Sequence, residues 1–144
     1  MALEKPSLRV LVVDDEQLIA ESLVTIFRQN GFAADCAYSG YGAIEMAKEL
    51  EPDVIISDVL MPGINGIDVA LTLARRLPKA RFVMLSGHAG FQENLSAARA
   101  RGLSFLYLEK PIPPKFLIGY LEDCQRELND IPPAVFASSI AACN

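Results

Sequence analysis

The sequence predicts an α/β protein with a doubly wound, parallel five-stranded sheet and helices on both faces. Short apolar runs rich in β-forming residues alternate five times with longer stretches whose apolar residues recur at helical spacing. Parallel neighbouring strands also need a right-handed connection of about helix size, which each longer stretch supplies. We therefore expect five β-α units, (βα)5, arranged as a three-layer sandwich.

The strands and the first helix follow from local patterns. Strands are predicted at Leu8–Val13, Phe32–Ala37, Asp53–Ser57, Ala80–Leu85 and Ser104–Leu108. After the first strand, apolar residues recur at three- and four-residue intervals from Leu18 to Phe27, and Asn30-Gly31 supplies a C-terminal stop. This pattern indicates an amphipathic helix.

The last helix closes the predicted domain. Its apolar residues repeat from Leu117 to Leu128, with Pro113-Pro114 before it and Pro132-Pro133 after it. No further strand-helix unit follows. We expect one domain over residues 7–129, and residues 130–144 form a C-terminal tail or the start of a linker.

Composition excludes several classes of protein. Hydrophobic residues make up 51% and charged residues 22% of the 144, which is typical of a globular domain. The net charge of −5 gives no field that attracts nucleic acid or an anionic membrane. The longest apolar runs, such as residues 54–56, are far shorter than the roughly 20 residues that span a bilayer. We expect no direct contact with nucleic acid or membrane.

The cysteines indicate a reducing compartment. Cys36, Cys124 and Cys143 are odd in number and have no paired spacing. The N-terminus lacks the charged-then-apolar pattern of a signal peptide. A cytoplasmic location is therefore expected.

Polar residues follow four of the predicted strands. They are Asp14-Asp15-Glu16 after the first, Asp58 after the third, Ser86 after the fourth and Lys110-Pro111 after the fifth. Ligands of such sheets bind outside the carboxyl ends of the strands. One acidic residue there is most often a helix or turn cap. Three carboxylates together would repel by about 4 kcal/mol per pair at 4 Å, which favours a bound cation.

The side chains at the strand ends predict which cation binds there and what reaction it supports. Carboxylate oxygens without a nearby Cys or His pair favour Mg²⁺, with Mn²⁺ as the second choice. Lys110, expected as an exposed charge on the rim, and the Ser86 hydroxyl would hold phosphoryl oxygens. Asp58 is the carboxylate available to take a phosphoryl group as an acyl phosphate.

Four motifs resemble the response regulator receiver family of two-component signalling, from about Leu8 to Leu128. They are LVVDDE, ISDVLMPGINGID, LSG and YLEKP, in the family's order and spacing. The resemblance implies a flavodoxin-like fold with strand order 2-1-3-4-5. It further implies that Asp58 accepts the phosphoryl group, that Asp14 and Asp15 bind Mg²⁺ with Asp58, and that the backbone carbonyl of Leu60 completes the protein ligands.

The resemblance also implies a switch. Ser86 and Lys110 would contact the phosphoryl group, and Tyr107 matches the family's aromatic switch position. The Lys110–Pro111 bond is similar to the family's cis peptide. The donor would be a sensor histidine kinase or a histidine phosphotransfer protein. The fourth helix, fifth strand and last helix would form the output face, for a homodimer or an effector.

Some other residues are interpreted without a role in the site. His88, two residues after Ser86, is interpreted as a solvated loop histidine. Gly102-Leu103 stands where the family often has Gly-Ala. The run Arg75, Arg76, Lys79 and Arg81 is interpreted as cations favoured at a helix end, with little weight as a nucleic-acid patch.

Three other functions use related chemistry or a related fold. A Mg²⁺-dependent phosphohydrolase of haloacid dehalogenase type also uses an aspartyl phosphate, but it needs DxD after the first strand, where Asp14-Asp15-Glu16 stands. A flavodoxin-like cofactor binder would need a phosphate loop there, and the acidic triplet repels phosphate. A receiver that acts only as a phosphate sink is the third. We expect a signalling receiver whose only chemistry is its own phosphorylation and dephosphorylation.

Overall fold

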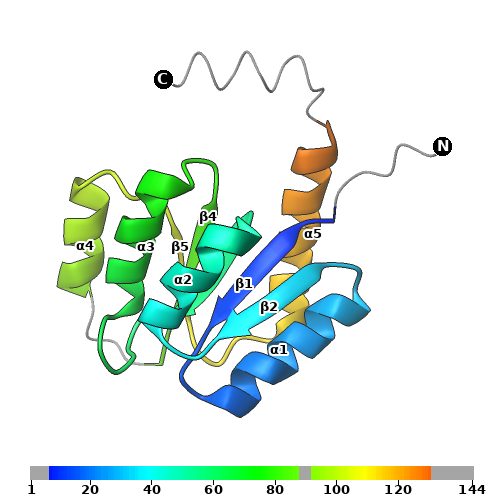
Figure 1. Cartoon of the computed structure of the whole chain (residues 1–144), viewed down its shortest axis with the longest axis horizontal. Coiled ribbons are helices and arrows are strands. Elements are labelled where there is room, and N and C mark those ends of the chain that lie inside the picture. The colour runs from blue at the N-terminus through cyan, green and yellow to red at the C-terminus, as the bar shows by residue number, and fades with distance from the viewer. Residues whose placement is uncertain (1–6, 88–91, 131–144) are drawn as a thin grey trace.

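The computed structural model describes residues 7–87 and 92–130. Its elements in chain order are β1 (Arg9–Val13), α1 (Gln17–Gln29), β2 (Ala33–Ala37), α2 (Gly40–Leu50), β3 (Val54–Asp58), α3 (Gly66–Arg76), β4 (Arg81–Ser86), α4 (Gln92–Ala100), β5 (Leu106–Glu109) and α5 (Pro114–Asp130). The strands form one parallel sheet in the order β2-β1-β3-β4-β5 (Figure 1). Both the fold class and the strand order are confirmed.

The strand ends differ slightly from the sequence prediction. β3 and β4 each extend one residue further, so that Asp58 and Ser86 are the last residues of strands and do not follow them. β5 begins two residues later than predicted and includes Glu109, because its register pairs Glu109 with Ser86 of β4. These shifts leave the same residues at the carboxyl edge of the sheet.

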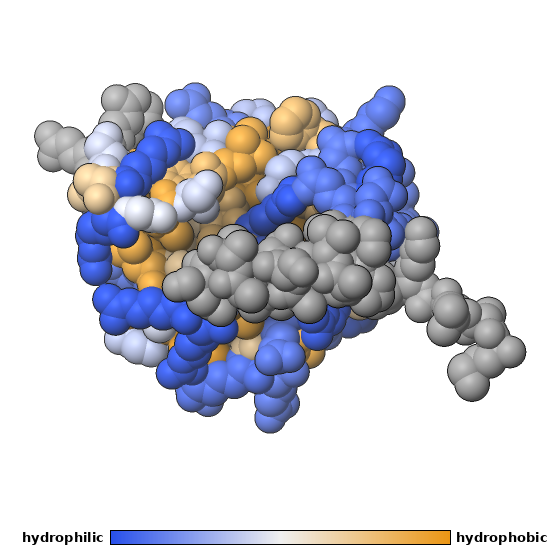
Figure 2. All heavy atoms as spheres, turned by 90° about the horizontal axis from the view of Figure 1, so that it is seen from above, coloured by the Kyte–Doolittle hydropathy of each residue, from blue (hydrophilic) through white to orange (hydrophobic). Residues whose placement is uncertain are grey.

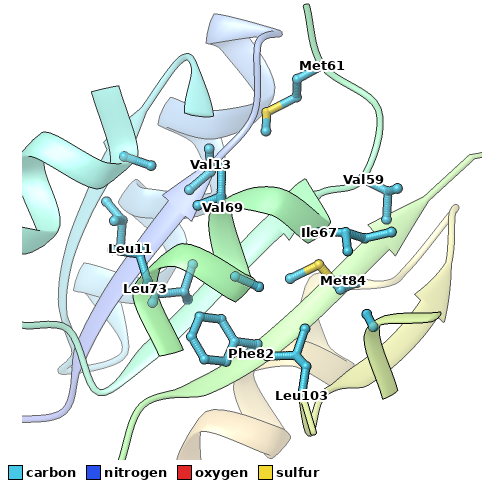
Figure 3. Close-up of a cluster of buried hydrophobic side chains, with 14 of the residues drawn as sticks. Leu11, Val13, Val59, Met61, Ile67, Val69, Leu73, Phe82, Met84 and Leu103 are labelled. Carbon is cyan, nitrogen blue, oxygen red and sulfur yellow. The ribbon is translucent and has the colours of Figure 1, made fainter. Parts of the chain in front are cut away.

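The sheet separates two hydrophobic cores. Successive side chains of a strand point to opposite faces, so Leu11 and Val13 belong to one core while Val10 and Val12 belong to the other. The first core packs under α2, α3 and α4, and Figure 3 shows Phe82 and Met84 of β4 within it. The second packs under α1 and α5. Each fully buried side chain of this kind contributes roughly 1.5–3 kcal/mol.

Short polar side chains begin two helices. The Ser39 hydroxyl accepts the backbone N–H of Gly42 at 3.0 Å at the start of α2. The Asn65 amide oxygen accepts the N–H of Asp68 at 2.9 Å at the start of α3. These caps satisfy donors that a helix leaves free at its first turn. They fix where α2 and α3 begin against the sheet.

Two further observations concern the helices and the cysteines. Among the described residues, none of the helices is both long and apolar enough to cross a membrane. Cys36 and Cys124 are free thiols; Cys36 is partly exposed, and Cys124 is buried on the inner face of α5.

Candidate functional site

The carboxyl edge of the sheet gathers the predicted site residues. Asp14 follows β1, Asp58 ends β3, Ser86 ends β4 and Lys110 follows β5. These four strands are neighbours and parallel, so their carboxyl ends meet at one edge. The fold therefore brings together residues that are up to 96 positions apart in the chain, from Asp14 to Lys110.

Asp14 is the buried member of the acidic group. It is only 3% exposed, and its Oδ1 accepts the backbone N–H of Glu16 at 2.9 Å. Its own N–H donates to the carbonyl of Ala37 at 3.1 Å. Because both contacts fix the turn after β1, the carboxylate is held in place before any ligand arrives.

Asp14, Asp15 and Asp58 form a set of oxygen donors. One carboxylate oxygen from each lies within 4.8 Å of the others. Asp15 is exposed, whereas Asp58 is partly buried. Hard divalent cations such as Mg²⁺ and Mn²⁺ prefer oxygen-only donors and retain waters beside them. The three carboxylates fit that requirement.

Lys110 is the cation that the fold itself supplies. Its Nζ lies 3.3 Å from Oδ2 of Asp58 and 3.5 Å from Oδ2 of Asp14. Its side chain is 27% exposed, so the sequence expectation of an exposed charge is wrong. The reason is its backbone N–H, which donates to the Ser86 carbonyl at 2.8 Å and draws Lys110 in beside the strand ends. The bond from Lys110 to Pro111 is cis.

The pKa values of Asp58 and Lys110 are both shifted by burial and by the charges around them. Burial raises the pKa of Asp58, the Lys110 ammonium opposes this, and the carboxylates of Asp14 and Asp15 add to it. For Lys110, burial lowers the pKa, but Asp58 and Asp14 outweigh burial, and the net pKa is raised. One lysine therefore does not neutralise the acidic group, and a further cation is favoured.

A hollow of about 530 Å³ opens above these side chains. It is lined by Asp15, Glu16, Asp58, Leu60, Met61, Pro62, Gly87 and Lys110. The loop after β3 forms one wall: Val59 and Met61 are buried while Leu60 between them is 53% exposed. The N–H of Val59 donates to the Leu85 carbonyl at 2.9 Å, which anchors the loop to β4. Leu60 is thereby placed at the edge of the hollow.

Two residues beneath the site were not singled out from the sequence. The Ser57 hydroxyl donates to the Asp58 carbonyl at 2.9 Å. Gly66 begins α3 so close to β3 that a Cβ there would meet the Asp58 carbonyl oxygen at 2.2 Å. Gly66 also donates its N–H to Val59 at 2.8 Å. The only sequence signal was the glycine within NGID, which is equally typical of a turn.

Ser86 and Tyr107 lie on neighbouring strands. Ser86 is 2% exposed at the end of β4. Tyr107 pairs with Met84 and is a half-buried side chain packed against the first core. His88 lies outside the described residues.

An apolar groove adjoins the hollow on the side of α1. It has a volume of about 620 Å³ and is lined in part by Asp14 of the acidic group and by Lys110. Leu18 on its edge is 83% exposed and Ile19 is 39% exposed. The helical pattern placed both residues on an apolar face, but they do not enter the core.

Comparisons with known proteins agree with this geometry. The family model described as the response regulator receiver domain matches residues 10–122. The DNA-binding response regulator MtrA of Mycobacterium tuberculosis (strain ATCC 25618 / H37Rv) is 32% identical over 124 residues, 86% of this chain and 53% of that protein. The chain thus spans about half the length of the curated relatives it matches.

Solved structures show the same architecture. The chemotaxis protein CheY4 of Vibrio cholerae, 27% identical, superposes with a TM-score of 0.73 over 82% of this chain and 98% of that one. A CheY-like receiver domain protein from Methanospirillum hungatei JF-1 has a TM-score of 0.76 at 20% identity, over 86% and 98% of the two chains, which bears on the fold alone. The sequence motifs, the fold and the family match lead to one conclusion: the chain belongs to the response regulator receiver domain family of two-component signalling.

Proposed function

We propose that Asp58 accepts a phosphoryl group from a histidine of a sensor kinase or of a histidine phosphotransfer protein. A carboxylate oxygen of Asp58 forms the new O–P bond, the N–P bond of the phosphohistidine breaks, and its electron pair returns to the imidazole. The product is an acyl phosphate on Asp58. The observation that carries the proposal is the shared hollow of Asp58, Lys110 and the acidic turn after β1.

The other rim residues support the transfer. Asp14, Asp15 and Asp58, with the backbone carbonyl of Leu60, would hold Mg²⁺, or Mn²⁺ in its place. The bound ion would neutralise charge on the transferring phosphoryl group. Lys110 and the Ser86 hydroxyl bind phosphoryl oxygens. Lys110 already lies 3.3 Å from the Asp58 carboxylate, so it needs no large movement.

We propose that phosphorylation is read by Ser86 and Tyr107. Once the phosphoryl group binds the Ser86 hydroxyl, the population shifts toward a state with the Tyr107 ring turned inward. β4 and β5 pair at Met84 and Tyr107, which supports coupling between them. The output face is α4, β5 and α5, and it takes a second copy or an effector.

The apolar groove beside α1 supports a docking site for the phosphodonor protein. A donor histidine must reach the hollow that contains Asp58. The groove adjoins that hollow, because Lys110 lines both of them and Asp14 lines the groove. The exposed side chains of Leu18 and Ile19 offer apolar surface there. The groove also contains Pro114 and Leu117, so a docked donor would contact the first turns of α5 as well as α1.

Further parts of the proposal concern the whole protein. We place the receiver unit at residues 7–129, although α5 continues to Asp130, and treat the rest as a tail or linker. MtrA is named as DNA-binding, but this chain matches only 53% of it, and the net charge of −5 supports no nucleic-acid contact by this domain. The free thiols Cys36 and Cys124 support a cytoplasmic location.

The acceptor is tested by intact mass after incubation with acetyl phosphate and Mg²⁺. The wild type is expected to gain one phosphoryl group, and Asp58→Asn none. Asp53→Asn is the matched control, because Asp53 lies at the opposite end of β3 and pairs with Arg9. Equal incorporation in wild type and Asp58→Asn would exclude Asp58.

The switch is tested by sedimentation and amide exchange with a beryllofluoride mimic. The mimic should change protection on β5 and α5 in the wild type and change it much less in Tyr107→Ala. No change in hydrodynamics, partner binding or protection would favour a phosphate sink. Steady release of inorganic phosphate from small phosphoesters, lost in Asp58→Asn, would favour the phosphohydrolase.

A further inference from the structure

The end of the molecule away from the acidic hollow carries a group of arginines. α3 ends with Arg75 and Arg76, and Arg101 follows the last residue of α4. α3 and α4 finish at the same end, opposite the carboxyl edge of the sheet (Figure 1). Figure 2 views this end, where long hydrophilic side chains surround recessed hydrophobic atoms.

Backbone contacts fix the position of Arg101. Gly102 has a left-handed φ of +92°, and its N–H donates to the Arg99 carbonyl at 3.0 Å. The N–H of Leu103 donates to the Ala98 carbonyl at 3.1 Å, which completes a Schellman-type helix end. Leu103 is buried in the first core. Arg101 is therefore held beside the last turn of α3, because α4 precedes it and the buried Leu103 follows it after one residue.

The arginines line two small hollows between α3 and α4. The larger, about 380 Å³, is lined by Asp68, Leu71, Thr72, Arg75, Arg76 and Arg101. The smaller, about 160 Å³, shares Leu71, Arg75 and Arg101 and adds Ala74, Gly102 and Leu103. Guanidinium groups thus stand beside an apolar floor of Leu71, Ala74 and Leu103.

These guanidinium groups form no close ion pair among the described residues, although the charge of Arg76 helps to lower the pKa of Glu45. Within the part of the chain that the structure describes, none of Arg75, Arg76 and Arg101 has a carboxylate oxygen within 4.0 Å, whereas Arg9, Arg28, Arg81 and Arg126 each form an ion pair. The single carboxylate at the larger hollow, Asp68, leaves it with an excess of positive charge. Cations are favoured at helix ends, which explains one arginine per helix but not three at a shared hollow.

We propose that this surface, defined by Arg75, Arg76, Arg101, Leu71 and Leu103, docks a short acidic segment of a partner protein through two kinds of contact. Carboxylates would pair with the guanidinium forks, which match carboxylate geometry in two parallel hydrogen bonds. An aliphatic side chain between them would cover the apolar floor. Because the surface lies away from the acidic hollow, docking there leaves Asp58 accessible.

Nucleic acid fits this surface less well. Base recognition on a single strand uses open aromatic faces, and Phe105, the aromatic residue near α4, is already covered by Arg99 at 4.4 Å. A duplex carries one charge about every 1.7 Å and would extend beyond three arginines onto a protein of net charge −5. A short segment with two or three carboxylates matches the size of the surface.

The test uses the peptide acetyl-EELEELEE-amide, titrated into ¹⁵N-labelled protein while amide shifts are followed. We expect saturable shifts confined to the last turn of α3 and to residues 100–103. Arg75→Gln/Arg101→Gln should weaken binding at least tenfold. Lys48→Gln/Arg126→Gln removes the same charge from exposed pairs elsewhere and should leave the affinity within twofold.

Two further probes examine the apolar floor and the class of partner. The peptide acetyl-EESEESEE-amide should bind at least fivefold more weakly, since it keeps the charge and lacks the aliphatic side chains. A twelve-residue oligothymidylate should bind more weakly than the leucine peptide. Equal binding of both peptides, equal loss in the two double variants, or tighter binding of the oligonucleotide would overturn the proposal. So would the absence of saturable shifts. None of these readouts depends on phosphorylation.

Discussion

At the scale of single residues, Asp58 stands in a site that disfavours its charge. Its folded-state pKa is raised, first by burial, so the folded protein binds the Asp58 proton more tightly than the unfolded chain does. Protonated Asp58 therefore contributes stability to the fold. This contribution is fully present below the pKa that Asp58 has in the unfolded chain, and it is lost as pH rises through the higher pKa of the folded state. We predict that Asp58→Asn stabilises the metal-free protein at pH 7 by about 1 kcal/mol. Urea unfolding with a chelator measures this.

The pH profile and a control variant complete that measurement. The gain from Asp58→Asn should shrink as pH falls and Asp58 takes up its proton. Asp35→Asn, which removes the carboxylate of an exposed pair with Arg28, should change stability by less than about 1 kcal/mol. A loss of stability in Asp58→Asn at pH 7 would contradict the raised pKa.

The charge of Lys110 stabilises the folded protein, whereas the charge of Asp58 destabilises it. Its removal leaves the Asp14 carboxylate, whose side chain is 4% exposed, without its cation. We predict that Lys110→Ala costs about 1–3 kcal/mol without metal, and that Mg²⁺ restores more stability to it than to the wild type. Lys48→Ala, in an exposed pair with Glu45, should cost less than about 0.5 kcal/mol. Equal losses in both variants would mean that Lys110 is only a surface charge.

The positions of the site residues show how much of the site the sequence can predict. The four polar strand ends were expected at one edge, and Asp14, Asp58 and Lys110 do lie within ion-pair distance. Strand order places these residues at one edge of the sheet. β5 lies three strands away from β1, however, so the contacts of Lys110 with Asp14 and Asp58 also depend on its long side chain. The burial of Lys110 was not foreseen, because it depends on a backbone bond to Ser86, 24 positions earlier.

At the scale of elements, the first residue of α3 closely approaches the end of β3. A Cβ on Gly66 would lie 2.2 Å from the Asp58 carbonyl oxygen, which is a backbone atom with little freedom to move. We predict that Gly66→Ala destabilises by about 2 kcal/mol or more, within the range of overpacking effects, and weakens Mg²⁺ binding by displacing Asp58. Thermal unfolding with and without Mg²⁺ measures both.

Gly119 provides the matched control. It lies within α5, and a Cβ there would meet nothing within 4 Å. Gly119→Ala should therefore stabilise by about 0.5–1 kcal/mol through helix propensity. If the two alanine variants behaved alike, the close approach of α3 to β3 would have no energetic role.

Sequence patterns predicted elements better than the contacts between elements. Each strand of the structure begins and ends within two residues of the predicted range, because short apolar runs rich in β-forming residues are local signals. Gly66 is not singled out by the sequence, because its close approach to β3 is not a local signal. Leu18 belongs to the apolar pattern of α1 but is 83% exposed, because the pattern does not show which apolar residues another element covers.

At the scale of the whole molecule, cation binding should be linked to folding. The folded state gathers three carboxylates within 4.8 Å, an arrangement that an unfolded chain lacks. We predict that Mg²⁺ stabilises the fold by about 1.4 kcal/mol at ten times its dissociation constant. Asp15→Asn should reduce this gain without reducing metal-free stability, because Asp15 is exposed. Urea unfolding in a Mg²⁺ series checks it, and a gain unchanged in Asp15→Asn would remove that residue from the site.

The parallel sheet also gives the molecule an electric polarity. Acidic side chains meet at the carboxyl edge, and the arginines of α3 and α4 stand at the other end. An approaching anion is therefore turned toward the arginines and repelled from Asp58. It follows that added salt, by screening this dipole, accelerates the encounter of small anionic phosphodonors with Asp58 and slows the capture of acidic segments at α3 and α4. One charge distribution thus gives two association rates with opposite dependence on ionic strength.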